Sequence, residues 1–221
     1  FRRKRRISTG EIYKWKARAN LDGSKQVKGL HCFETYAPVV SWSTIRLVLT
    51  MAIIKGWHTK QIDYVLAYTQ AKVETDNVYM KIPKGFEVRG SSQDEYVLKV
   101  ERNIYGGKAA GRVWNKHLVA RLTQIGFTQS QVDPCLFYRG SAIYVLYTDD
   151  SILAGPDEEE LDQIVQDMKD AGLKLTVDGD VSDFLGVKID RKPDGTIHLT
   201  QPQIIRDILQ DLRLTSDNVK T

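Results

Sequence analysis

Apolar residues recur at helical spacing in four stretches of the chain. Apolar side chains at i, i+3, i+4 and i+7 predict a helix over 43–55, with Ser43 as its cap and Gly56 after its end. The same spacing predicts helices over 109–125, between Asp157 and Gly172, and over 204–212. These four helices set the frame for the rest of the chain.

Shorter apolar or alternating stretches lie between the helices and predict strands. We expect strands over 58–64, 97–100, 135–138, 142–147, 151–154, 173–177, 184–189 and 196–199. The central part of the chain then runs strand, helix, strand pair, helix, strand. That order is typical of the split βαβ, ferredoxin-like fold, which belongs to the α+β class. Many unrelated proteins share this fold, so it does not determine the chemistry.

Composition narrows the class of protein. The chain has 221 residues, of which 42% are hydrophobic and 27% charged, as in ordinary globular proteins. No stretch approaches the roughly 18 consecutive apolar residues of a membrane span. Two distant cysteines, Cys32 and Cys135, favour a reduced, intracellular protein over a disulfide framework. Since the chain begins with Phe1, we expect a fragment or a processed piece.

The charge of the chain is mildly positive and unevenly spread. The net charge of +4 permits a phosphate-bearing partner without proving one. Five consecutive basic residues occupy 2–6. Such a run is typical of a nuclear-import signal or a nucleic-acid patch, and equally of a solvated, disordered end.

The most informative acidic residues are Asp149 and Asp150, which lie between two apolar strands. A buried carboxylate is costly unless it is paired or bound to a metal. At a hairpin turn, the two side chains can face a cleft at the edge of a sheet. The simpler interpretation is a solvated turn, because Asp is among the commonest turn residues.

Asp63 adds a third carboxylate to this interpretation. In a split βαβ sheet the first strand lies beside the central hairpin, so Asp63 is expected to face Asp149. Three carboxylates at one place repel one another unless a divalent cation neutralises them. Oxygen ligands suit Mg²⁺, and two such ions roughly 3.5–4 Å apart can promote phosphoryl transfer. Other catalytic schemes find little support, because the sequence contains no GxxxxGK[ST] loop and no His/Cys metal spacing.

Short motifs in a fixed order extend along nearly the whole chain. On these motifs the sequence resembles the Ty1/copia retrotransposon reverse transcriptases. The motifs are Lys14–Arg18, Phe33–Val40, Ser43–Arg46, Gln61–Asp63, Ala67–Tyr68, Val78–Met80, Pro83–Phe86, Ile104–Gly106, Arg112–Trp114, Gly126–Phe127, Asp133–Phe137, Tyr147–Asp150 and Phe184–Val187.

The resemblance implies an RNA-directed DNA polymerase, a nucleotidyltransferase that extends a primer 3′-hydroxyl. Asp63, Asp149 and Asp150 would be catalytic and would hold two Mg²⁺ ions, with Mn²⁺ as a possible substitute. Tyr68 would lie against the sugar 2′ position and favour deoxynucleotides; its alternative is simple core packing.

The resemblance also implies contacts to substrates. Lys16 and Arg18 would reach the incoming triphosphate, and Arg112 the template or nucleotide. Their alternative is solvated surface charge. The segment Phe184, Leu185 and Gly186 would grip the primer, and its alternative is an ordinary buried strand.

The family organisation is expected as well. Residues 1–12 would be a disordered basic segment, 13–200 the fingers and palm, and 201–221 the start of a thumb or connection helix. Partners would be an RNA/DNA template-primer, deoxynucleoside triphosphates and the ribonuclease H, integrase and protease domains of a parent polyprotein, with no membrane. The location would be a cytoplasmic particle or the nucleus.

Several residues depart from the family pattern. Leu66 replaces an Asn, Ala109 a Gln, Gly111 a Pro and Thr148 a Val, and Ala19–Leu21 departs from a Leu-Val-Ala run. None of these is a proposed metal ligand. They favour, as an alternative, a decayed copy that only binds nucleic acid. A ferredoxin-like nucleotidyl cyclase is a further alternative, although it does not explain the motifs at 33–40 and 184–187.

Overall fold

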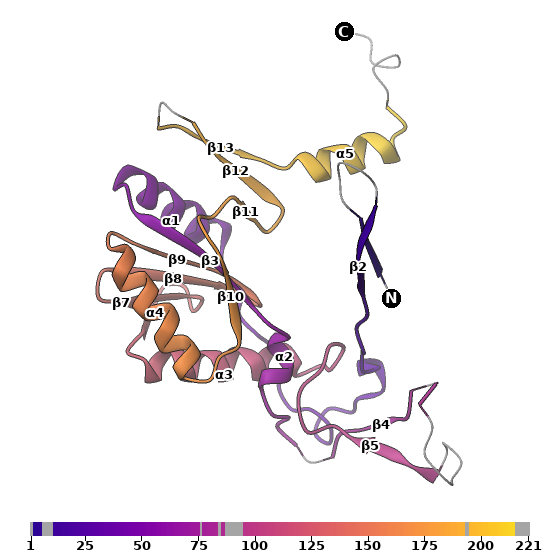
Figure 1. Cartoon of the computed structure of the whole chain (residues 1–221). Coiled ribbons are helices and arrows are strands. Elements are labelled where there is room, and N and C mark those ends of the chain that lie inside the picture. Colours follow the sequence, from indigo (N-terminus) through magenta and orange to yellow (C-terminus); the bar gives the residue numbers. More distant parts are fainter. Residues whose placement is uncertain are drawn as a thin grey trace. The chain divides into compact units, whose positions relative to one another are not determined.

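The chain forms two compact units (Figure 1). The first unit contains residues 1–38 and 66–121, and the second contains 39–65 and 122–221. The computed structural model describes residues 2–5, 11–75, 77–83, 85–86, 95–192 and 195–214.

A six-stranded antiparallel sheet forms the centre of the second unit. Its strand order is β10-β3-β9-β8-β7-β6. The strands are β3 (His58–Tyr64), β6 (Thr128–Gln129), β7 (Leu136–Arg139), β8 (Ala142–Tyr147), β9 (Asp150–Gly155) and β10 (Leu175–Asp178). The first strand of the motif lies between the last strand and the central hairpin, as the split βαβ order requires. The predicted α+β class and the predicted strand order are therefore confirmed.

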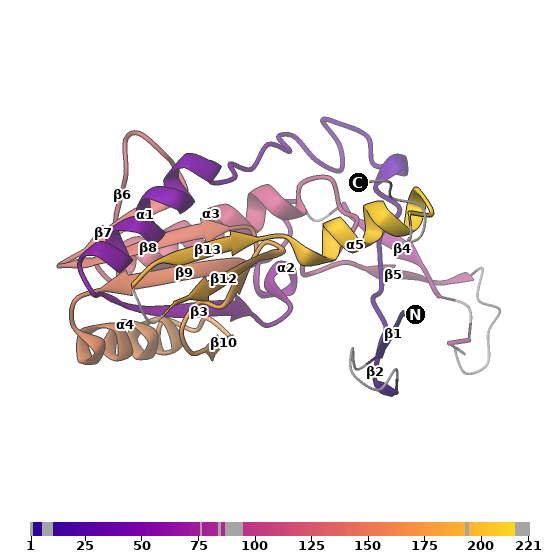
Figure 2. The same ribbon diagram turned by 90° about the horizontal axis from the view of Figure 1, so that it is seen from above.

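Two helices lie on opposite faces of this sheet (Figure 2): α1 (Trp42–Ile54) and α4 (Glu158–Asp170). Each helix presents an apolar stripe with the spacing that the sequence predicted. The buried residues are Ile45, Val48, Leu49 and Ala52 in α1, and Leu161, Ile164, Val165 and Met168 in α4.

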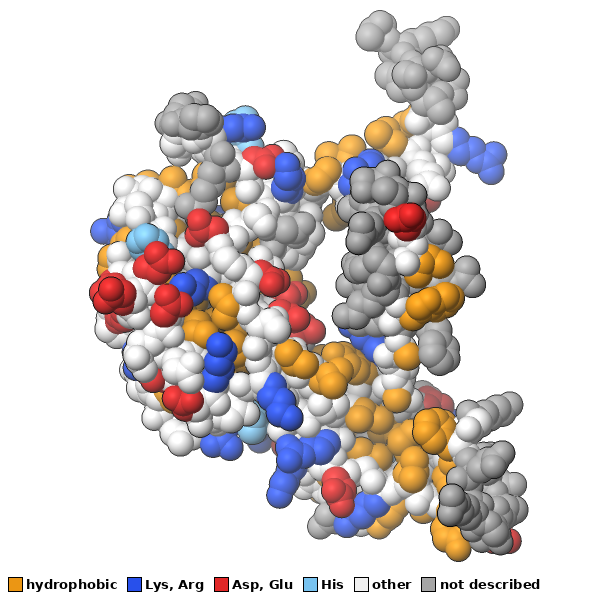
Figure 3. Space-filling view, in the orientation of Figure 1, with side chains coloured by type: hydrophobic (Ala, Val, Ile, Leu, Met, Phe, Trp, Pro, Cys, Tyr) orange, Lys and Arg blue, Asp and Glu red, His pale blue; other side chains and the backbone are white. Residues whose placement is uncertain are grey.

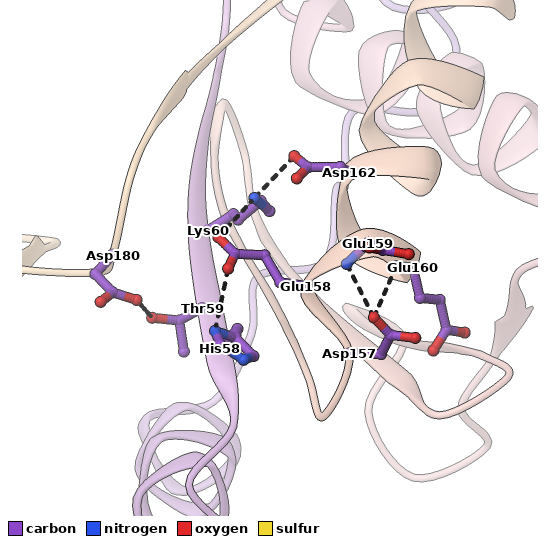
Figure 4. Close-up of polar contacts among 9 residues, drawn as sticks. All are labelled: His58, Thr59, Lys60, Asp157, Glu158, Glu159, Glu160, Asp162 and Asp180. Carbon is purple, nitrogen blue, oxygen red and sulfur yellow. Dashed lines mark hydrogen bonds and ion pairs between the residues drawn. The ribbon is translucent and has the colours of Figure 1, made fainter.

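The start of α4 is fixed by charge. The carboxylate of Asp157 caps the helix by accepting from the backbone N–H groups of Glu159 and Glu160. Acidic side chains gather there (Figure 3), where they oppose the positive end of the helix dipole. Lys60 reaches over from β3, with its Nζ 2.8 Å from Asp162 Oδ1 and 3.7 Å from Glu158 Oε1 (Figure 4). This partly buried ion pair ties the helix to the sheet.

The start of α1 is fixed by a more distant residue. The cap is Ser41 rather than the expected Ser43, because Ser41 has the extended backbone that a cap requires and its Oγ accepts from the Thr44 N–H at 3.1 Å. The buried carboxylate of Asp133 then accepts from Ser41 N–H at 3.2 Å and from Thr44 Oγ1 at 2.6 Å. Its other oxygen accepts from Cys135 N–H at 2.9 Å. One side chain thus joins α1 to the segment that leads into β7.

A three-stranded sheet and a helix complete the second unit. They are β11 (Asp183–Phe184), β12 (Val187–Arg191), β13 (Ile197–Thr200) and α5 (Pro202–Asp211). β12 and β13 pair antiparallel near the strands expected over 184–189 and 196–199. The exposed apolar side chains of α5 are Ile204, Ile205, Ile208, Leu209 and Leu212.

The described part of the first unit contains two small antiparallel sheets and three helices. They are β1 (Arg2–Arg5) with β2 (Ile12–Lys16), β4 (Tyr79–Lys81) with β5 (Val97–Lys99), η1 (Gly23–Lys25), α2 (Ala67–Gln70) and α3 (Ala110–Gln124), whose last turn belongs to the second unit. Within the segment 1–12, residues 2–5 form β1. Antiparallel pairing uses main-chain groups, so a run of basic side chains does not prevent it. Within the described residues no helix combines the length and the apolar character needed to cross a bilayer.

The Asp133 contacts predict a pH-dependent contribution to stability. Burial raises the pKa of the Asp133 carboxyl, but the hydrogen bonds from Thr44, Cys135 and Ser41 outweigh burial and hold that pKa below its usual value. The contribution is therefore complete above the unfolded pKa of about 3.9, and it is lost as pH falls through the folded pKa.

We expect Asp133→Asn to lower the free energy of unfolding by about 1–3 kcal/mol at pH 7, because an amide cannot accept all three hydrogen bonds. Urea unfolding at pH 7 and pH 3 measures the effect. The difference between variant and wild type should shrink at pH 3. The exposed Asp170→Asn is the matched control; an equal loss in both variants would contradict the prediction.

Candidate active site

The turn between β8 and β9 carries two of the predicted acidic residues. Tyr147 and Asp150 are cross-strand partners, so Thr148 and Asp149 alone form the turn. Thr148 has φ +54°, a conformation that is unusual for a β-branched residue. Backbone strain of this kind, which costs on the order of 1–3 kcal/mol, tends to cluster at functional sites.

Asp63 lies beside this turn. The register pairs Asp63 directly with Asp150, and the Tyr64 N–H donates to the Asp149 carbonyl at 3.2 Å. The sequence predicted that Asp63 would face Asp149; its cross-strand partner is the next residue. Directly opposed residues project to the same face with Cβ atoms about 5 Å apart. Asp63 and Asp150 therefore form an acidic row on one face, adjoining Asp149.

The three aspartates of this region differ in their exposure to solvent. Asp63 is exposed, and Asp149 and Asp150 are half-buried. Like charges directly opposite each other in a sheet are destabilising unless a cation lies near them. Carboxylate oxygens are the ligands that Mg²⁺ prefers. Within the described residues no three acidic, His or Cys side chains come close enough together to hold a metal ion, so these aspartates would have to turn toward one another to share one.

The opposite face of the same strands is rigid and buried. The hydroxyls of Tyr64 and Tyr144 are hydrogen-bonded at 2.7 Å, and the Ser151 Oγ donates to the Ile62 carbonyl at 3.2 Å. Burial raises the pKa of both tyrosines, which stay protonated. These bonds join β3, β9 and β8 directly behind the acidic row, and so they fix its register. Tyr144 was not expected from the sequence, because its position in an apolar strand gives no signal of such a hydrogen bond.

Two of the predicted nucleotide contacts share one aromatic neighbour in the first unit. The guanidinium of Arg18 lies 4.9 Å from the centre of the Tyr105 ring, and the ring of Tyr68 lies 5.0 Å from the same ring. Arg18 is exposed and Tyr68 half-buried. The chain passes close to Leu21 here, since a Cβ on Gly106 would lie 2.1 Å from the Leu21 carbonyl oxygen. The glycine after Tyr105 is thus a packing requirement.

The other two predicted contacts are placed differently. Arg112 lies in the first turn of α3, and its Nη1 donates to Glu74 Oε1 at 2.7 Å. A partly buried ion pair therefore already engages this side chain. The backbone of Lys16 belongs to β2, while its side chain lies outside the described part of the structure.

The predicted primer contact is a hairpin turn. Phe184 is buried at the end of β11, and Leu185 and Gly186 form the two-residue connection to β12 with φ of +53° and +77°. Two successive residues with positive φ are typical of a tight hairpin turn. An ordinary buried strand, the alternative that we considered, is wrong for Leu185 and Gly186.

Non-glycine residues with positive φ concentrate at the motifs. Among the described residues they are Leu66, Thr148, Leu185 and Arg213. The first three lie in the segments that the sequence singled out around Asp63, Asp149 and Phe184. Leu66, with φ +52°, precedes α2 without any side-chain cap, so its backbone strain has no local compensation.

Comparison with known proteins gives consistent relatives. A family model described as "Reverse transcriptase (RNA-dependent DNA polymerase)" matches residues 1–221. The retrovirus-related Pol polyproteins from transposons RE1 and RE2 of Arabidopsis thaliana are each 35% identical over 206 residues, which is 91% of this chain and 14% of theirs. The Pol polyprotein from transposon TNT 1-94 of Nicotiana tabacum is 27% identical over 95% of this chain and 16% of its own length. The chain therefore spans about a seventh of these relatives.

Among solved structures, a telomerase from Candida albicans, in a complex with a fragment of telomeric RNA, aligns with a TM-score of 0.40 and 12% identity. The alignment covers 81% of this chain and 39% of the telomerase chain.

Leu66 offers a test of the strain at the motifs. We expect Leu66→Asn to raise the free energy of unfolding by about 1 kcal/mol and Tm by about 2–4 °C, because Asn tolerates the left-handed region and Leu66 is exposed. Thermal unfolding measures the change. Leu66→Ala removes the same side chain without the Asn preference, and it should show no gain. An Asn variant no more stable than the Ala variant would contradict the prediction.

Proposed function

The chain belongs to the reverse transcriptase (RNA-dependent DNA polymerase) family and is of the Ty1/copia type, and from this membership we propose that it copies an RNA template into DNA. The observation that carries the proposal is the pairing of Asp63 with Asp150 beside the turn that contains Asp149. Family membership leaves the cyclase alternative without support.

The three aspartates are the proposed ligands of two Mg²⁺ ions. The carboxylates supply the oxygen donors, and their mutual repulsion favours binding of a divalent cation. When bound, the ions supply activation of a primer 3′-hydroxyl and neutralisation of the triphosphate charge. The buried Tyr64–Tyr144 pair holds β3 and β8 in place across β9, so the backbone that carries Asp63 and Asp150 is fixed while their side chains would turn toward a shared ion.

The first unit supplies the proposed nucleotide contacts. Tyr68 packs against Tyr105, and its ring is the proposed filter for the sugar 2′ position. Arg18 is the proposed triphosphate contact, together with Lys16. Arg112 is a weaker candidate, because it must first release Glu74.

The hairpin turn at Leu185 and Gly186 is the proposed primer contact. Phe184 is buried and anchors the turn in the core, and the pairing of β11 with β12 flanks the two turn residues. A rigid backbone turn can donate and accept hydrogen bonds to a nucleic-acid backbone without reading its sequence.

A decayed copy that only binds nucleic acid is the second proposal. Gly111, where the family has proline, lies in the first turn of α3, and a Cβ there would lie 3.8 Å from the Ala37 Cβ. That spacing is ordinary contact, so the position has room for a Cβ, and the glycine loosens the helix start. With Ala109 in place of glutamine, this region is the weakest part of the proposed nucleotide site.

The surrounding assembly follows from the relatives. Since they are Pol polyproteins, we propose that this chain works beside protease, integrase and ribonuclease H domains. A template-primer and deoxynucleoside triphosphates are the proposed substrates, and a cytoplasmic particle or the nucleus is the proposed location.

Primer extension tests the activity. With poly(rA)·oligo(dT), labelled dTTP and Mg²⁺, we expect extension by the wild type and a loss of at least about 100-fold in Asp149→Asn, because one metal ligand is lost. The exposed Asp170→Asn should extend normally. A wild type that binds the template-primer yet never extends it would support the decayed copy instead.

Thermal unfolding tests the metal site separately from catalysis. With Mg²⁺ at about five times its dissociation constant, we expect about 1 kcal/mol of stabilisation and a rise in Tm of about 2–4 °C. Asp63→Asn should lose this rise, because one of the three proposed ligands is gone. Asp162→Asn should keep the rise. An unchanged Mg²⁺ effect in Asp63→Asn would rule out the proposed ligand.

A further inference from the structure

A groove of about 550 Å³ opens on the first unit. None of its lining residues belongs to the acidic row. Its charged or titratable lining residues are Lys72, Glu74, Arg102, Lys116, His117 and Arg121. Four are permanently basic at neutral pH, and within the described chain Glu74 is the one acidic residue of the lining.

One wall of the groove is held by backbone contacts. Lys72 and Arg102 form an isolated antiparallel bridge, which sets two like charges opposite each other. The Arg102 Nη1 donates to the Gln70 carbonyl at 2.8 Å, and the Asn103 Nδ2 donates to the Lys72 carbonyl at 2.8 Å. Two cations held in a destabilising arrangement gain from an anion between or above them.

The other wall is one side of α3. Lys116 is exposed, and His117 and Arg121 are half-buried. The His117 ring stacks on the fully buried Trp114 ring, with 5.9 Å between centroids, so its position is fixed. Burial lowers the pKa of His117, and the charges of Arg121 and Arg102 lower it further.

The charge of Glu74 is largely compensated. Its Oε1 lies 2.7 Å from Arg112 Nη1 and 3.5 Å from Lys116 Nζ. Arg112 is not part of the lining, so Glu74 removes little of the positive potential that the groove presents.

We propose that this groove binds the phosphate backbone of a single nucleic-acid strand. Cations on two facing walls suit a chain of phosphates that passes between them. The described lining contains no Phe, Tyr or Trp on which a base could stack, so the contact is independent of sequence. The choice of nucleic acid as the anion rests on the proposed function. The cluster of cations in the groove is observed independently of that function.

Binding of a fluorescent 20-nucleotide RNA by the full chain, followed by anisotropy at 50–200 mM salt, tests the groove. The test variant is Lys72→Gln with Lys116→Gln, and the matched control is Lys25→Gln with Lys99→Gln, two exposed lysines of the same unit outside the lining. Each lost phosphate contact lowers the salt slope by about 0.7, so the test variant should lose about 1.4. Between 50 and 200 mM salt, the affinity of the test variant for RNA should therefore fall about sevenfold less than that of the wild type.

Two results would overturn the inference. One is equal affinity and salt slope in the test and control variants. The other is displacement of the RNA by inorganic triphosphate at equal phosphate concentration, together with equal affinity for 6- and 20-nucleotide strands. That result would assign the groove to a small anion. If the wild type does not extend a primer but the test and control variants still differ in RNA affinity, only the proposed function is contradicted. If the wild type extends a primer normally but the two variants bind RNA equally, only the groove proposal is contradicted.

The His117 ring provides a second readout that does not rely on removing charge. In NMR titrations of labelled histidines, assigned with His117→Gln, we expect the pKa of His117 to rise when RNA is added, since the phosphate offsets Arg102 and Arg121. The charged groups facing this ring are Lys72, Arg102, Lys116, Arg121 and Glu74. An unchanged His117 pKa in saturating RNA would contradict the proposal.

Discussion

The register of β3 against β9 is the constraint on which the rest of the second unit depends. That register places Asp63 directly opposite Asp150, and like charges in this arrangement are destabilising unless a cation lies near them. Contacts on the opposite face hold the strands in this register. They are the buried hydroxyl pair of Tyr64 and Tyr144 and the hydrogen bond from Ser151 to the Ile62 carbonyl. The buried face of the strands thus fixes the register of the face that carries the two aspartates.

Strained backbone conformations are likewise supported by buried contacts. Thr148 and Leu185 adopt positive φ in turns whose flanking strands are firmly paired. Each strained turn lies at a motif, and each is held by buried neighbours such as Phe184. A two-residue connection leaves the backbone little freedom, so the side chains and amides at its tip are presented in a single arrangement.

Much of this could be predicted from the sequence, because the relevant signals are local. Helical spacing located α1, α3 and α4, and the order of elements gave the split βαβ sheet. The adjacency of Asp63 and the hairpin followed from that topology. Long-range hydrogen bonds left no such signal: the contact of Asp133 with Ser41 joins residues 92 positions apart, and it moved the helix cap away from Ser43. The pairing of β4 with β5 and the contact of Arg112 with Glu74 depend on tertiary placement in the same way.

The second unit is assembled from two stretches of chain, with residues 66–121 of the first unit inserted between them. Ser151 lies 89 positions beyond Ile62, its partner across β3 and β9. During synthesis on the ribosome, β3 therefore emerges well before its partner β9. In that interval the apolar residues of β3 are not covered by a sheet. Closing so long a loop is slow, and an unpaired strand is prone to aggregate. The yield of folded protein should accordingly depend on the pace of translation through this insertion and on chaperones that cover β3 during that interval.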